Sequence, residues 1–299
     1  MRPKYLCPCV TAFHPDGSID FAAQAAVYDW LIAGSIDGIL VLGSMGEFFA
    51  LTDSQRRELA EFSVEHIAGR ASVMVGTSAM RFEDTLQLSR HGLQAGADSV
   101  AVISPYYLKL TQQELITFYD RLADQVDGPV YLYNYPDRTV HSMDAETVLA
   151  IRRKHPNVVG IKDSATTAEH TIEIVKTVCP EYPDFEVYCG FDNYLPAVYA
   201  AGGTGAIGGL SNVAPALLHQ WCQAIGDGDA PRQAALTAQV EKLMGLYYVG
   251  MPFSPFIKEA VRLTGIPMDT GSTFPLPRAT AEESARVAAI LKDAGVSIG

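Results

Sequence analysis

The sequence predicts an α/β fold in which eight parallel strands close into a (β/α)8, or TIM, barrel with a C-terminal helical extension. Short β-branched runs alternate with longer amphipathic stretches, a repetition that implies parallel strands with right-handed crossovers. The strands are apolar throughout, as expected when both faces of a sheet are buried. The chain has 299 residues, of which 48% are apolar, enough for a barrel of roughly 250 residues and a short extension. Eight such units favour a closed barrel over an open doubly wound sheet.

Each predicted element follows from this pattern. We expect the strands at residues 6–13, 37–43, 72–77, 99–105, 129–134, 158–164, 185–190 and 204–209. Amphipathic stretches between them, such as residues 53–69 and 81–97, are long enough to cross back over the sheet. After the last strand we expect helices near residues 215–226, 230–248, 254–263 and 280–294. The chain is then a single domain, with the barrel in residues 1–225 and the extension in residues 226–299.

Composition excludes several classes of function. The formal net charge of -12 opposes binding to a phosphate backbone, so we expect no nucleic-acid partner. The sequence has no run of about 18 apolar residues and no apolar signal segment at its start, so we expect a cytoplasmic protein without a membrane span. Five cysteines without a CxxC pair argue against a disulfide framework, and seven scattered histidines without HxH or HExxH argue against a metal site.

Lys162 is the first candidate catalytic residue. It follows the apolar run VVGI directly, and a buried ammonium costs several kcal/mol by rough desolvation values unless it is paired or neutral. Asp163 is a poor partner, because adjacent strand residues point to opposite faces. Either Lys162 leaves the apolar layer for solvent, or an apolar wall lowers the pKa of its amine and makes it a nucleophile toward carbonyls. The spacing alone leaves both possibilities open.

Other strand ends carry further candidates, because a parallel barrel places its active site at the C-terminal ends of its strands. Tyr133 ends the strand next to that of Lys162, where it is either a core aromatic or a proton shuttle at an imine. In GSMGE the Gly-rich turn around Ser44 and Met45 could expose backbone amides to an anion such as a carboxylate. The run GGTGAIGG at the eighth strand lacks the Lys and Ser/Thr of a nucleotide phosphate loop. We therefore favour a close approach of its backbone to a small substrate over phosphate binding.

The motifs GSMGE, SPYY, YNYPDRT, GIKDS and GFDN occur in this order. With them the chain resembles, from about residue 5 to its C-terminus, the pyruvate-dependent class I aldolases of the dihydrodipicolinate synthase and N-acetylneuraminate lyase family. The resemblance implies that Lys162 forms an imine, that Tyr133 shuttles protons, that Ser44 relays them and that Tyr107 reaches into a neighbouring subunit's site. It also implies a homotetramer, built as a dimer of dimers, that needs no metal or other cofactor beyond the covalent imine with Lys162.

The same resemblance implies further substrate-binding residues. The backbone amides of Ser44 and Met45 would hold the carboxylate of a keto acid, and the backbone at Gly190 and Ile207 would line the lysine pocket. Met45 departs from the threonine that is common in the family, which removes a hydroxyl but keeps the amide.

Substrate signals are mixed. Arg138 matches the arginine that binds the aldehyde's carboxylate in dihydrodipicolinate synthase, whereas GEFFAL looks more like the keto-deoxy-acid and hydroxy-oxoglutarate branches. Asp192 matches a sugar-hydroxyl ligand of the neuraminate lyases, but Gly209 stands where those enzymes carry a serine.

We therefore expect a Schiff-base aldolase that reversibly cleaves a 2-keto-3-deoxy (4-hydroxy-2-oxo) acid to pyruvate and an aldehyde. Alternatives within the family are condensation of pyruvate with aspartate semialdehyde, cleavage of N-acetylneuraminate, and dehydration of a keto-deoxy acid. The alternative from another class is a barrel that binds a keto acid without catalysis. The sequence does not fix the aldehyde or the physiological direction.

Overall fold

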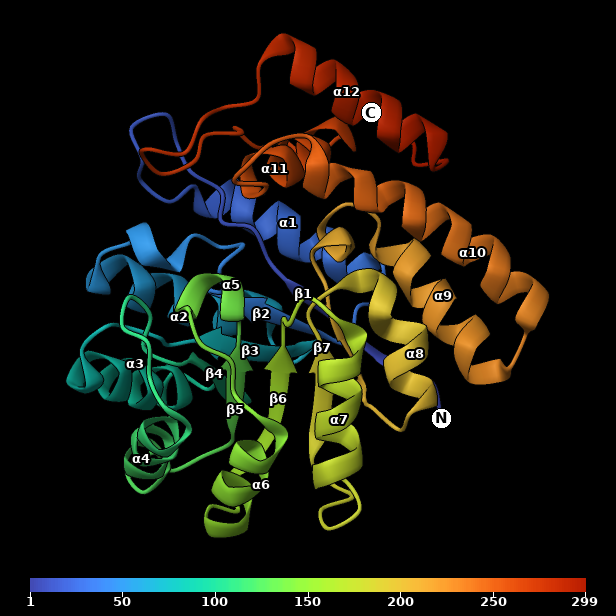
Figure 1. The fold of residues 1–299 in the computed structure, drawn as a ribbon. Coiled ribbons are helices and arrows are strands. Elements are labelled where there is room, and N and C mark those ends of the chain that lie inside the picture. The colour runs from blue at the N-terminus through green and yellow to red at the C-terminus, as the bar shows by residue number, and fades with distance from the viewer. The chain divides into compact units, whose positions relative to one another are not determined.

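The eight strands form a closed parallel barrel in the order β1 to β8, in a computed structural model that describes residues 1–299, and this confirms the predicted fold class (Figure 1). The strands are β1 (Lys4–Pro8), β2 (Gly38–Val41), β3 (Ser72–Gly76), β4 (Ser99–Ile103), β5 (Val130–Asn134), β6 (Val158–Asp163), β7 (Glu186–Cys189) and β8 (Gly205–Ile207).

Helices follow the strands in alternation. The α-helices are α1 (Phe21–Ala33), α2 (Asp53–Ile67), α3 (Phe82–Gln94), α4 (Gln112–Ala123), α5 (Pro136–Thr139), α6 (Ala145–Lys154), α7 (Ala168–Val178), α8 (Leu195–Ala200), α9 (Pro215–Asp227), α10 (Ala230–Leu243), α11 (Ser254–Leu263) and α12 (Ala281–Asp293). Short 3-10 helices are η1 (Phe48–Ala50), η2 (Asp192–Tyr194), η3 (Gly209–Asn212) and η4 (Met244–Tyr248).

The chain forms two compact units, which we describe separately. The terminal unit contains Met1–Ser72 and Gly208–Gly299, and the central unit contains Val73–Ile207. The predicted boundary between residues 225 and 226 falls inside α9, and the division into barrel and extension stays a prediction.

In the central unit, alternate strand residues pack against the helices. Val130 and Leu132 of β5 and Ile161 of β6 are fully buried in one apolar cluster with residues of α4, α6 and α7. Figure 1 shows α6 and α7 running alongside β5, β6 and β7. Since successive side chains of a strand alternate between faces, Tyr133 and Lys162 lie on the face away from these helices.

In the terminal unit, the first strand is shorter than predicted and begins earlier. β1 ends at Pro8, and only the amide of Cys9 extends its pairing, with a bond to the Leu40 carbonyl. The amide of Val10 donates instead to Asn212 Oδ1 at 3.0 Å, and that of Ala12 to Gln24 Oε1 at 2.8 Å. Side chains from elsewhere in the chain thus take the amides that would have continued the strand.

The other predicted boundaries differ by small amounts. The predicted helix 230–248 is α-helical only to Leu243 and continues as η4, and the eighth strand ends at Ile207 because residues 209–212 turn into η3. The helix expected at residues 254–263 has those bounds.

Three features bear on the excluded classes. All five cysteines are free thiols; four are buried and Cys179 is half-buried. No group of three or more His, Cys, Asp or Glu side chains is arranged so that it could hold a metal ion. None of the helices combines the length and the apolarity needed to cross a membrane.

Candidate active site

Lys162 and Tyr133 face each other at the C-terminal ends of neighbouring strands. The parallel register of β5 and β6 pairs Tyr133 with Lys162, and each is only 4% exposed. Lys162 has therefore not left the apolar layer for solvent. Its Nζ lies 4.4 Å from the centroid of the Tyr133 ring. The structure brings together an amine and a phenol, the two groups that imine chemistry with proton transfer requires.

A polar cluster lies one layer deeper on the same face, with Tyr131 and Tyr188 buried and Glu186 half-buried. Tyr131 and Tyr188 both donate their hydroxyl hydrogen to Oε2 of Glu186, Tyr188 at 2.9 Å. Burial, reinforced by the charge of Glu186, raises the pKa of Tyr131, so this phenol keeps its proton. At Gly160, directly before Ile161, a β-carbon would lie 2.5 Å from the Glu186 carbonyl oxygen and from Tyr131 Cε1. Glycine is required there because the Tyr131 ring occupies the space.

Glu186 was not among the site residues predicted from the sequence. The available signal was a single carboxylate inside the apolar run FEVYC, where an unpaired charge would be costly. In the structure Glu186 is half-buried, and its carboxylate accepts hydrogen bonds from two phenols, one on β5 and one on β7.

In the terminal unit, the predicted Gly-rich turn after β2 is tight. The amide of Gly46 donates to the Gly43 carbonyl at 3.0 Å, and that of Glu47 donates to the Ser44 carbonyl at 3.3 Å. The non-glycine residues Leu42 and Glu47 on either side have φ angles of 56° and 57°, in the left-handed region. Such backbone strain persists only when surrounding contacts hold it. Met45 within this turn is 6% exposed and Ser44 is half-buried.

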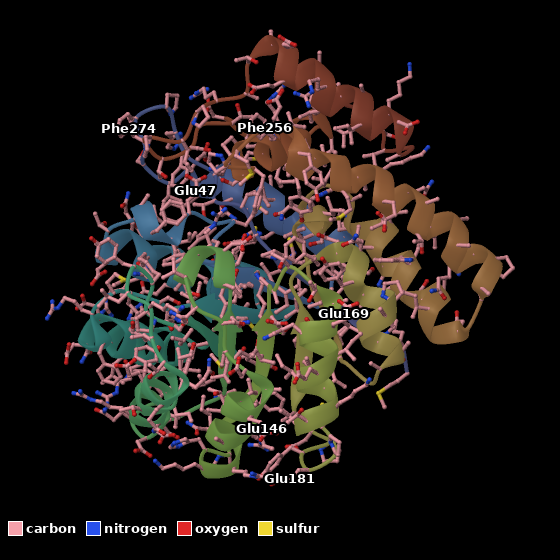
Figure 2. The ribbon with its side chains drawn as sticks, viewed as in Figure 1. Glu47, Glu146, Glu169, Glu181, Phe256 and Phe274 are labelled. Atoms are coloured by element: carbon pink, nitrogen blue, oxygen red, sulfur yellow. The ribbon has the colours of Figure 1, made fainter.

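The contacts that hold this turn come from α11 and the loop between α11 and α12. Glu47 and Lys258 of α11 form an ion pair in which both side chains are 0% exposed. Oε2 of Glu47 also accepts hydrogen bonds from the amide and the hydroxyl of Thr273, both at 2.7 Å. Figure 2 labels Glu47 and, on the loop beyond Thr273, Phe274. Burial lowers the pKa of Lys258, which Glu47 opposes.

The remaining pocket residues of the prediction lie in the central unit. The Gly190 amide donates to the Asp163 carbonyl at 2.7 Å, and a β-carbon at Gly190 would lie 2.0 Å from Ser164 Oγ, so only glycine fits. Asp192 opens η2 and is fully buried, as is Ile207 at the end of β8.

Tyr107 and Arg138, by contrast, are exposed. Tyr107 is 86% exposed and has a φ angle of 88°, an unusual conformation for a tyrosine. Arg138 lies in the single helical turn α5, with its guanidinium carbon 5.5 Å from the centroid of the Tyr135 ring. Neither side chain is buried with the Lys162 and Tyr133 pair.

Gly209 has little room for a side chain. A β-carbon there would lie 2.6 Å from the hydroxyl oxygen of Tyr247 and 2.7 Å from Cε of Met45. A serine at this position, as the neuraminate lyases carry, would require both side chains to move.

Comparison with known proteins agrees with this architecture. The model of the dihydrodipicolinate synthetase family matches residues 3–294. The provisionally named 2-dehydro-3-deoxy-D-gluconate aldolase YagE of Escherichia coli K12 is 36% identical over 281 residues, covering 94% of this chain and 92% of YagE. YjhH of the same organism, provisionally named a 2-dehydro-3-deoxy-D-pentonate aldolase, is 34% identical and covers 97% of this chain and 96% of its own.

Other relatives carry a different activity in their names. The 4-hydroxy-tetrahydrodipicolinate synthase of Azoarcus sp. is 32% identical over 289 residues, covering 96% of each chain. Among solved structures, that of YagE in complex with pyruvate has a TM-score of 0.96 at 33% identity and covers 98% of this chain and 99% of YagE. The chain belongs to the dihydrodipicolinate synthetase family.

Proposed function

We propose that this chain is a class I aldolase that reversibly cleaves a 2-keto-3-deoxy acid to pyruvate and an aldehyde through an imine at Lys162. The observation that carries the proposal is the buried Lys162 amine held against the ring of Tyr133 at adjacent strand ends. The names of YagE and YjhH, and the pyruvate bound to YagE, support this reaction and this product.

The reaction begins with the neutral amine of Lys162, which attacks the C2 ketone. Loss of water leaves a protonated imine that can accept an electron pair. Tyr133 takes the proton of the C4 hydroxyl, and Ser44 and the Tyr107 of a neighbouring subunit relay this proton. The C3–C4 bond then breaks: the electron pair of this bond moves toward the imine and forms the enamine of pyruvate, and C4 leaves as the aldehyde. Protonation at C3 and hydrolysis by one water release pyruvate and restore the amine.

This assignment gives the imine the role of electron sink, so the reaction needs no metal or cofactor. The backbone amides of Ser44 and Met45 would hold the substrate's C1 carboxylate, since a turn of freed amides suits an anion. Because every step is reversible, the same residues serve cleavage and synthesis.

Borohydride trapping tests the proposal. Protein incubated with pyruvate and borohydride should gain the mass of a reduced pyruvyl group, and peptide mapping should locate it on Lys162. Lys162→Ala should lose the adduct while keeping its circular dichroism spectrum, and Lys154→Ala, at a surface lysine, should retain it. Absence of any adduct on the wild type would favour a barrel that binds keto acids without catalysis.

A substrate panel separates the family's activities. Keto-deoxy sugar acids and 4-hydroxy-2-oxoglutarate test cleavage, aspartate semialdehyde with pyruvate tests condensation, and keto-deoxy acids also test dehydration. The crowding of Gly209 by Met45 and Tyr247 supports a low rate with N-acetylneuraminate. Condensation with aspartate semialdehyde is the second candidate, because synthases of that reaction are among the relatives and Arg138 is present.

We also propose a homotetramer in which Tyr107 completes the site of a neighbour. The exposure and left-handed backbone of Tyr107 in the single chain support this role. Hybrids of Lys162→Ala and Tyr107→Phe subunits test it, because the first variant supplies an intact Tyr107 to the second. Turnover should rise on mixing if Tyr107 acts across the interface, and should stay at the sum of the two variants if it acts within one chain.

A further inference from the structure

Asp163 and Asn134 directly follow Lys162 and Tyr133 on their strands, and both are 1% exposed. The β5 and β6 register pairs them with each other, as it pairs Tyr133 with Lys162. Since neighbouring strand residues alternate between faces, Asp163 and Asn134 point toward the helices while the catalytic pair points away.

The Asp163 carboxylate accepts three side-chain hydrogen bonds. Asn134 Nδ2 donates to Oδ1 at 2.7 Å, and Thr171 Oγ1 and His170 Nδ1 reach Oδ2 at 2.6 Å and 2.9 Å. His170 and Thr171 belong to the first turn of α7. The bond to Asp163 raises the pKa of His170 despite its partial burial. A buried carboxylate is thus supplied with donors from the neighbouring strand and from the helix that follows its own.

The network continues into the segment after β5. Oδ1 of Asn134 accepts the amide of Met143 at 3.0 Å, and Ser142 Oγ lies 3.1 Å from His170 Nε2. We name Asn134, Ser142, Asp163, His170 and Thr171 the Asp163 network. It ties the ends of β5 and β6 to α7 and to residues 142–143.

We propose that the Asp163 network is a positioning device for the catalytic pair, an inference that rests on the proposed function of Lys162 and Tyr133. The orientation of a strand's last residues is fixed by contacts on both faces, and here one face carries the reacting groups. Hydrogen bonds on the other face hold the twist of both strand ends, and so the distance between the Lys162 amine and the Tyr133 ring. Imine and proton-transfer steps are sensitive to such distances, because a misplacement of about 1 Å can cost roughly 100-fold in rate.

The chemistry of the network favours positioning over stability alone. Well-packed apolar side chains of similar volume often stabilise a core as well as buried charges do. Directional bonds to a carboxylate, in contrast, define a single arrangement of the strand ends. The buried Asp163 carboxylate and its donors therefore fix the positions of the two strand ends more than they add to the free energy of folding.

Variants at His170 test the inference, because this side chain is 22% exposed and its replacement leaves Asp163 the donors of Asn134 and Thr171. His170→Ala removes one donor to Asp163, whereas His170→Asn keeps a donor near the position of Nδ1. His66→Ala is the matched control: His66 contacts Asp29 at 3.0 Å and is 25% exposed, but belongs to α2 of the terminal unit. Asp163→Asn, which places an amide hydrogen against at least one donor, is the stronger companion variant.

The readout is kcat per active site, with sites counted by borohydride trapping with pyruvate. A residue that only stabilises the fold changes the number of trapped sites but not kcat per site. We expect His170→Ala and Asp163→Asn to lose about tenfold in kcat per site, with His170→Asn within about twofold of the wild type and His66→Ala unchanged. If His170→Ala keeps the kcat per site of the wild type, the positioning role is refuted while the proposed function stands. A wild type that traps no pyruvate would overturn the proposed function and this inference with it.

Discussion

The buried ion pair of Glu47 and Lys258 allows a sharp prediction about stability. Both side chains are 0% exposed. Lys258→Met keeps the length of the side chain and its apolar stem but removes the charge. The carboxylate of Glu47 then keeps only the two donors of Thr273. We expect the variant to fold less stably because a buried charge has lost its counter-ion.

The complete burial of this ion pair determines how large the loss of stability should be. Removing one partner of a buried pair costs about 3–5 kcal/mol in the free energy of unfolding. With an unfolding entropy of about 2.1 cal/mol/K per residue, this loss lowers the melting temperature of a 299-residue chain by roughly 5–8 °C. Lys258 also loses its bond to the Gly271 carbonyl at 3.0 Å and its place 4.4 Å from the Phe13 ring centroid, both of which act in the same direction.

The assay is urea unfolding followed by circular dichroism, with Lys154→Met as the matched control. Lys154 also forms an ion pair, with Asp120 at 2.6 Å, but its side chain is 58% exposed. The same substitution there should leave the free energy of unfolding near that of the wild type, because solvent screens the pair.

A double variant isolates the pairwise contribution. Glu47→Gln with Lys258→Met removes both charges, keeps an acceptor for Thr273, and should recover about 2 kcal/mol relative to the sum of the single losses. A loss in Lys258→Met no larger than in Lys154→Met, or additive single losses, would refute the reasoning.

Three further predictions use other sites. Gly160→Ala should lose about 1–3 kcal/mol of stability, because its β-carbon would lie 2.5 Å from a backbone oxygen of β7. Gly245→Ala, whose nearest neighbour atom would be at 3.5 Å, is the control, and equal melting temperatures would count against the packing argument. Tyr107→Phe should lower kcat without preventing the trapped adduct, and an unchanged kcat would remove Tyr107 from the relay. The stabilisation that His170 gains from Asp163 should be full below the ordinary pKa of 6.5 and be lost as the pH rises through the raised pKa of the folded protein. The wild type should therefore lose stability relative to His170→Asn as the pH rises from about 6.5 through the raised pKa of His170, measured by urea unfolding, and a constant difference would contradict the coupling.

The local pattern of the chain determined much of the fold. Apolar runs at regular spacing predicted all eight strands, and the amphipathic stretch predicted from residue 53 is confirmed by α2, which begins at Asp53 after the capping box of Thr52 and Gln55. These features depend on residues close together in sequence, where alternation and capping act directly. The order of strands also placed Tyr133 beside Lys162, because consecutive units of a parallel barrel are neighbours.

Long-range partners are what the pattern could not supply. The end of β1 depended on Asn212, a residue 202 positions away from Val10. Likewise Glu47 and Thr273, separated by 226 positions, meet only in the folded chain. Helix and strand propensities and apolar periodicity do not predict which buried polar groups will pair over such separations.

The sequence by itself determined the barrel and the identity of the candidate nucleophile and proton shuttle. Only the tertiary structure decided how Lys162 is kept from solvent and what stands behind it, namely the Asp163 carboxylate with its three donors. The physical reason is that apolar periodicity is satisfied by any partner surface, whereas a buried charge is tolerated only where particular donors from distant segments converge on it.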